Sequence, residues 1–210
     1  MSKRSEARFT AFAGDRTLVR GDLDKVARAC KAAMEAGTTD LIRIFDDRTG
    51  DRVDLELEGS MQEVADRVQW LRAYMAVKGA GAEGAPRGRG RPKLGVVSKE
   101  VTLLPRHWAW LDGQRGSASA VLRRLVDEAR KANADTDKIR KAQDVTYRFV
   151  HDLAGNARSF EEAIRALYAG DRDRFVAETE HWSSDVREYA RRLAEDAWGA
   201  GGTEPSEEGE

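Results

Sequence analysis

Residues 41–57 read Leu-Ile-Arg-Ile-Phe-Asp-Asp-Arg-Thr-Gly-Asp-Arg-Val-Asp-Leu-Glu-Leu, and this stretch brings β structure into a chain dominated by helical patterns. The apolar run Leu41–Phe45 predicts a buried strand, and the polar–apolar alternation over Asp51–Leu57 predicts a half-buried one. Between them, Asp47-Arg48-Thr49-Gly50 has the composition of a hairpin turn, in which Gly supplies a positive φ. The stretch therefore predicts a β-hairpin.

Elements of similar length precede this hairpin. Phe9–Ala13 and Thr17–Arg20 are short strand candidates separated by the turn Gly14-Asp15. Asp22 then has the position of a helix N-cap, and Gly37 ends the helix. The apolar residues between them recur at helical spacing: Leu23, Val26, Cys30, Ala33 and Met34.

A second helix is expected after the hairpin. Ser60 is its candidate N-cap, and the apolar residues that follow lie on one face: Val64, Val68, Leu71 and Met75. Together with the preceding strands, these helices predict a small α/β domain over residues 1–78.

The chain from Asp135 to Trp198 has the pattern of consecutive helices. Ser159 and Glu162 have the spacing of a capping box, which would begin one of them. We therefore expect a helical region over residues 133–199, followed by a disordered acidic tail over residues 200–210. With the N-terminal strands, these helices predict the fold class α+β.

The bulk composition limits the class of protein. Lys and Arg number 36 against 37 Asp and Glu, giving a formal net charge of −1, and 40% of residues are hydrophobic. No apolar run approaches the length of a membrane span, and the first ten residues do not resemble a signal peptide. The single cysteine, Cys30, forms no intramolecular disulfide and lies on the apolar face of its helix, so we expect core packing and a cytoplasmic location.

A basic strip interrupts this balance. No acidic residue lies between Glu83 and Glu100, and residues 79–98 are expected to form a flexible linker. Its core, Arg89-Gly90-Arg91-Pro92, resembles an AT-hook, an arm that enters the minor groove of A·T-rich DNA, where negative potential is concentrated. A flexible linker without a ligand is the alternative interpretation. The resemblance makes these side chains the main DNA contacts: Arg87, Arg89, Arg91 and Lys93.

Residues 99–132 follow the arm in the order strand, short helix, Gly turn, longer helix. The strand is expected over Lys99–Pro105, and the order resembles the ribbon-helix-helix family of bacterial DNA-binding proteins. In that family two chains pair their strands into a ribbon that enters the major groove. The resemblance would point Val101 and Leu103 into a homodimer core and Thr102 toward DNA bases. It would also place further DNA contacts at Lys99, Arg106, Arg115 and Ser117.

Over nearly its whole length the chain resembles one uncharacterised bacterial family of unknown function. The motifs that carry this resemblance are GRGRPKLGVV, EVTLLPRHW and LRRLVDEARK, which begin at Gly88, Glu100 and Leu122. The resemblance supplies no catalytic residue and no cofactor.

Residues with catalytic or metal-binding chemistry are sparse. His107, His151 and His181 lie far apart in sequence without ligand partners at metal-site spacing. The acidic residues around the hairpin lack the alternating oxygen ligands of a calcium loop, so turn chemistry explains them better. Trp108 and Trp110 are expected to anchor a core, with base stacking as the alternative.

The sequence therefore predicts a DNA-binding protein that is regulatory or nucleoid-associated, acts without catalysis, cofactor or metal, and forms a homodimer. A protein-interaction module with a solubilising basic linker is the alternative. The C-terminal helices are assigned to packing and partner contacts.

Overall fold

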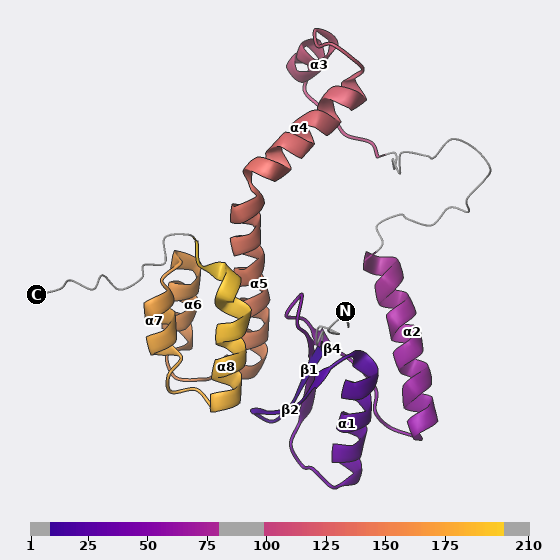
Figure 1. Cartoon of the computed structure of the whole chain (residues 1–210), viewed down its shortest axis with the longest axis vertical. Coiled ribbons are helices and arrows are strands. Elements are labelled where there is room, and N and C mark those ends of the chain that lie inside the picture. The colour runs from indigo at the N-terminus through magenta and orange to yellow at the C-terminus, as the bar shows by residue number, and fades with distance from the viewer. Residues whose placement is uncertain (1–8, 80–98, 200–210) are drawn as a thin grey trace, which may run out of the picture. The chain divides into compact units, whose positions relative to one another are not determined.

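The computed structural model describes residues 9–79 and 99–199, and it has the predicted α+β class (Figure 1). The chain divides into two compact units, the core unit (residues 1–69 and 135–210) and the middle unit (residues 70–134). The described elements, in chain order, are β1 (Phe9–Ala13), β2 (Arg16–Gly21), α1 (Leu23–Glu35), β3 (Ile42–Asp46), β4 (Arg52–Val53), α2 (Met61–Gly79), α3 (Pro105–Asp112), α4 (Ala118–Ala132), α5 (Ala134–Ala154), α6 (Phe160–Ala169), α7 (Arg172–Glu178), α8 (Ser184–Leu193) and the 3₁₀ helix η1 (Ala194–Ala197).

The strands form one antiparallel sheet in the order β2-β1-β3-β4, which confirms the predicted hairpin. Its second strand is shorter than the predicted Asp51–Leu57, because only Arg52–Val53 pair with β3. The Nη1 of Arg67 in α2 donates to the carbonyls of Glu56 and Glu58 at 3.2 and 2.6 Å. A side chain from the following helix thus binds one carbonyl within the predicted strand and one just after it.

The two faces of the sheet are covered by different helices (Figure 1). On one face lies α1, whose first turn is capped by Asp22 accepting from the Lys25 amide. Cys30 is fully buried there, and burial raises the pKa of its thiol to about 12. The structure thus confirms Cys30 as a packing residue, because its thiol stays protonated at neutral pH.

The opposite face of the sheet carries an aromatic cluster shared with the C-terminal helices. The ring of Phe149 in α5 lies 5.4 Å from Phe12 of β1, 5.1 Å from Phe45 of β3 and 4.4 Å from Tyr189 of α8. Phe12, Phe45 and Phe149 are completely buried. The sheet and the C-terminal helices therefore share one core, unlike the separate 1–78 and 133–199 domains expected from sequence, because each supplies the apolar face that the other buries.

The hairpin turn packs closely against α5. Arg148 of α5 donates through Nη1 to the carbonyl of Thr49 at 2.7 Å. Gly50 has φ +70°, and a Cβ placed on it would lie 2.1 Å from the Val145 carbonyl oxygen. Only glycine fits this close approach, so the turn is fixed against the helix.

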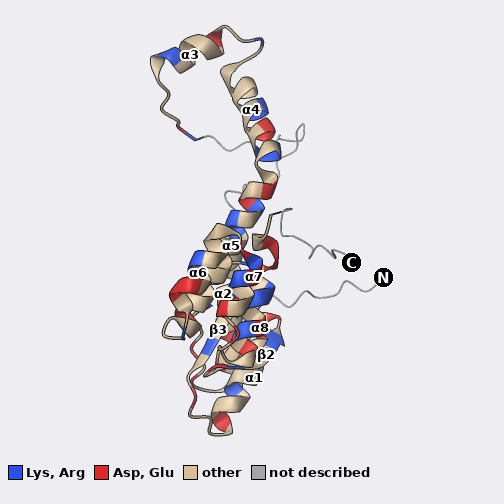
Figure 2. Ribbon diagram, turned by 90° about the vertical axis from the view of Figure 1, so that its left-hand side faces the viewer, with Lys and Arg blue, Asp and Glu red and all other residues tan. Residues whose placement is uncertain are grey.

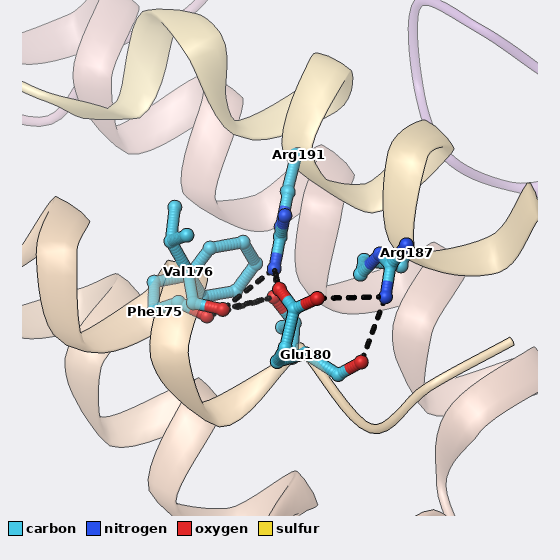
Figure 3. A network of polar contacts seen from close by, with 6 residues as sticks. Phe175, Val176, Glu180, Arg187 and Arg191 are labelled. Carbon is cyan, nitrogen blue, oxygen red and sulfur yellow. Dashed lines mark hydrogen bonds and ion pairs between the residues drawn. The ribbon is translucent and has the colours of Figure 1, made fainter. Parts of the chain in front are cut away.

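A polar network joins α7 to α8 (Figure 3). Arg191 donates through Nη2 to the carbonyl of Val176 at 2.6 Å and to Oε2 of Glu180 at 2.8 Å, and Arg187 binds Oε1 of the same carboxylate at 3.1 Å. These contacts satisfy a carbonyl at the C-terminal end of α7, which gives the network a structural role.

Two predicted helix starts differ in outcome. Ser60 and Glu63 form the reciprocal contacts of a capping box before α2. At α6 the capping box predicted from Ser159 and Glu162 is wrong: Ser159 has φ +62° and makes no capping hydrogen bond. Glu162 instead pairs with two arginines, Arg165 and Arg174, so its carboxylate is not turned back toward the helix start.

The middle unit contains the second half of α2 and the helices α3 and α4. Leu111 of α3 and Val121 of α4 are its buried apolar side chains in this region. The strand expected over Lys99–Pro105 does not form: residues 99–104 carry no strand pairing, and Pro105 is already the first residue of α3. A strand needs a neighbour for its backbone groups, and no described strand pairs with these residues.

Candidate functional site

The DNA contacts expected from sequence fall into two sets. Arg87, Arg89, Gly90, Arg91, Pro92 and Lys93 of the basic arm lie outside the described residues. The remaining set lies in the middle unit, where all members are exposed: Lys99, Thr102, Arg106, Arg115 and Ser117.

Ser117 is the N-cap of α4. Its Oγ accepts a hydrogen bond from the Ala120 amide at 3.3 Å, and its extended backbone begins α4. Arg115 lies two residues earlier and is exposed. The start of α4 thus combines a helix N-terminus with a nearby guanidinium, an arrangement that favours a phosphate group.

The surface of residues 99–133 is unusually apolar for an exposed segment. Five of its large apolar side chains are exposed, from 41% for Trp108 to 62% for Val101. The prediction that Trp108 and Trp110 anchor a core is wrong for the described residues of this chain, where α3 packs against α4 and leaves both rings exposed. The full set of exposed apolar residues here is Val101, Leu104, Trp108, Trp110 and Val126.

Charge on the same segment is mixed but positive in balance. Residues 99–133 hold seven Lys or Arg against four Asp or Glu, whereas the whole chain carries −1. Both signs occur along α4 (Figure 2), where Arg124 and Glu128 form an i,i+4 pair and Arg130 pairs with Asp127. The excess charge therefore comes from the segment as a whole and not from one basic stripe.

A second group of polar residues, which the sequence did not single out, lies in the core unit around Asp47. Oδ1 of Asp47 accepts hydrogen bonds from the Tyr189 hydroxyl at 2.6 Å and from the Thr10 hydroxyl at 2.8 Å. Oδ2 lies 3.6 Å from Nη2 of Arg192, whose guanidinium also sits 4.5 Å from the Tyr189 ring centroid. The cluster joins the hairpin turn to β1 and to α8.

Burial controls the protonation of this cluster. The side chain of Asp47 is only 12% exposed, and this desolvation raises its pKa although Tyr189, Thr10 and Arg20 favour the ionised form. Burial and the neighbouring Asp47 also raise the pKa of Tyr189, so its hydroxyl remains a donor. In sequence Asp47 is an ordinary turn residue, and nothing local marks its contact with Tyr189, 142 positions away.

A pocket of about 690 Å³ opens beside this cluster. Its walls come from the hairpin turn, α5, α8 and η1, all in the core unit. Four basic and two acidic side chains line it, together with three apolar ones: Arg48, Lys138, Lys141, Arg192, Asp47, Asp196, Ala142, Val145 and Leu193.

Across residues 9–79 and 99–199, no group of three or more His, Cys, Asp or Glu side chains is arranged to hold a metal ion. None of the helices in the same ranges combines the length and apolar character needed to cross a membrane.

Comparison with known proteins gives one match. Residues 8–194 match DUF2239, a family described as an uncharacterized protein conserved in bacteria. No curated protein and no solved structure matches the chain. The family match spans the sheet, the middle unit and the C-terminal helices together, and the chain therefore belongs to the bacterial DUF2239 family.

Proposed function

We propose that this protein binds DNA as a homodimer, with a regulatory or nucleoid-associated role and without catalysing a reaction. The observation that carries the proposal is the uncovered apolar surface of residues 99–133. This surface accompanies residues 99–104, which have no strand pairing, and two helices in the order found in ribbon-helix-helix proteins.

Dimerisation accounts for that surface. Residues 99–104 have no strand partner among the described residues, and Val101, which would face the dimer core, is 62% exposed. Pairing with the same segment of a second chain would satisfy those backbone groups and bury apolar side chains from both copies. The two-fold ribbon produced in this way has the dimensions to enter a major groove.

Two sets of basic residues would then contact DNA. Lys99, Arg106 and Arg115, with the N-terminus of α4 at Ser117, would bind phosphates beside the ribbon. The arm containing Arg89 and Arg91 would enter the adjacent minor groove, as its resemblance to an AT-hook implies. Phosphate contacts set the affinity, while Thr102 faces the bases.

The experiment is a fluorescence-anisotropy titration of A·T-rich and G·C-rich duplexes at several salt concentrations. If the arm makes ionic contacts, log K against log salt should have a slope of magnitude about 3–4 or more. Arg89→Ala with Arg91→Ala should lower that magnitude by roughly 2 and weaken binding to both duplexes. The matched control removes two exposed arginines of the core unit, Arg140→Ala with Arg172→Ala, and should leave the slope unchanged.

Three outcomes contradict the proposal. Absence of duplex binding at low salt removes DNA as the ligand and favours the protein-interaction alternative. An unchanged slope in the arm variant excludes the arm as a contact. Equal losses in the arm and control variants indicate nonspecific attraction to positive charge.

A further inference from the structure

We infer that the pocket beside Asp47 binds a small organic phosphate. The inference concerns residues of the core unit alone and is independent of DNA binding. It starts from the imbalance of charge in the pocket, where Arg48, Lys138, Lys141 and Arg192 face two carboxylates.

Those two carboxylates already have partners. Asp196 forms an ion pair with Nζ of Lys138 at 2.7 Å. Asp47 accepts hydrogen bonds from two hydroxyl groups, and its Oδ2 lies 3.6 Å from Nη2 of Arg192. Lys141 has no acidic partner among the residues that the structure describes. Its ammonium group is therefore the cation most available to an anionic ligand.

The two guanidinium groups are held in place before any ligand binds. Arg48 donates through Nε and Nη2 to the buried carboxylate of Asp46, at 3.2 and 2.8 Å, which leaves Nη1 for another acceptor. Arg192 is fixed between Asp47 and the ring of Tyr189. Because these contacts order both side chains, a ligand would lose little affinity to side-chain ordering.

The size of the pocket and its apolar wall select the class of ligand. A volume of about 690 Å³ is typical of a small-molecule site and is larger than a bare phosphate ion would fill. Ala142, Val145 and Leu193 offer apolar surface beside the cations. A phosphate ester with an apolar or aromatic body matches both features, because basic side chains bind phosphate strongly and the apolar wall accepts the body.

The test is isothermal titration calorimetry on the full chain with adenosine monophosphate, adenosine, ribose 5-phosphate and inorganic phosphate. We expect adenosine monophosphate to bind more tightly than ribose 5-phosphate or inorganic phosphate, and adenosine to show no binding. Lys141→Gln should weaken adenosine monophosphate about tenfold, equivalent to about 1.4 kcal/mol. Lys138→Gln provides a second variant and should also weaken it.

The matched control is Arg140→Gln, which removes one charge from the adjacent exposed position outside the pocket and should change affinity less than twofold. Equal losses in Lys141→Gln and Arg140→Gln would overturn the site, as would failure of the wild type to bind any of the phosphates at millimolar concentration. Loss of duplex binding in Lys141→Gln without any small-phosphate binding would also overturn it and assign the lysine to DNA.

Discussion

The core unit and the middle unit differ in how far they bury their apolar side chains. In the core unit, sheet and helices bury an aromatic cluster centred on Phe149 from both sides. In the middle unit, α3 and α4 bury Leu111 and Val121 and leave Trp108 and Trp110 in solvent. Seven of the ten large apolar side chains exposed in the described residues belong to the middle unit, although it is the smaller part.

The contrast shows which unit can bury its own apolar side chains without a second chain. A sheet with helices on both faces can bury its apolar residues within one chain. The described part of the middle unit holds the second half of α2, the helices α3 and α4, and the unpaired residues 99–104, which offer too little shared apolar surface to do so. The core unit is therefore expected to set the stability of the chain, and the middle unit to set its association with other molecules.

The largest expected effect follows from truncating the center of the aromatic cluster. Phe149→Ala removes a completely buried ring from the junction of β1, β3 and α8. The free energy of unfolding of the core unit should fall by about 3–5 kcal/mol. Chemical denaturation followed by circular dichroism measures it. The control Tyr168→Ala removes a half-exposed ring from α6 and should cost about 1 kcal/mol or less. Similar losses in both variants would show that the cluster is not the core.

A somewhat smaller effect is expected at Asp47. Asp47→Ala leaves the buried hydroxyls of Tyr189 and Thr10 without their acceptor, at a cost of about 2–4 kcal/mol. Asp47→Asn keeps an oxygen that accepts both hydroxyls and should cost about 1 kcal/mol or less. Equal costs in the two variants would show that these hydrogen bonds contribute little.

Protonation of Asp47 gives this prediction a pH dependence. Because burial raises the pKa of Asp47 above its ordinary 3.8, the folded chain holds the carboxyl proton more tightly than the unfolded chain. The stability contribution of Asp47 is therefore largest below pH 3.8 and falls as the pH rises through the folded-state pKa. Wild type should lose stability relative to Asp47→Asn between acid and neutral pH, and the opposite trend would contradict the direction of the shift.

The smallest effect on stability, about 0.5 kcal/mol or less, is expected from Leu103→Asp in the middle unit. The same change should dissociate the proposed homodimer, because a ribbon would bury this charge without a partner. Size-exclusion chromatography with light scattering measures the mass. Thr102→Asp adds the same charge on the alternate face of the segment and should leave the dimer intact. A wild-type monomer at micromolar concentration would contradict the proposed dimer.

Local patterns were sufficient for much of the secondary structure. Phe9–Ala13 was predicted as a strand with its observed bounds, and the helices beginning near Asp22 and Ser60 have the caps that the sequence suggested. These features depend on neighbours within a few residues, such as a hydroxyl that accepts an amide three positions later. The alternation over Asp51–Leu57 predicted too long a strand, because β4 ends at Val53 and Arg67 of α2 binds the Glu56 carbonyl beyond it.

By itself, the sequence determined the α+β class, the N-terminal hairpin, the helical C-terminal region and the bacterial family to which the chain belongs. Only the tertiary structure decided that the two ends of the chain share one core, and that Asp47 meets Tyr189 beside a basic pocket. The physical reason is the sequence separation of the residues that interact. Caps and turns arise from contacts within a few residues, whereas a shared core and a pocket arise from apolar burial between segments more than a hundred positions apart.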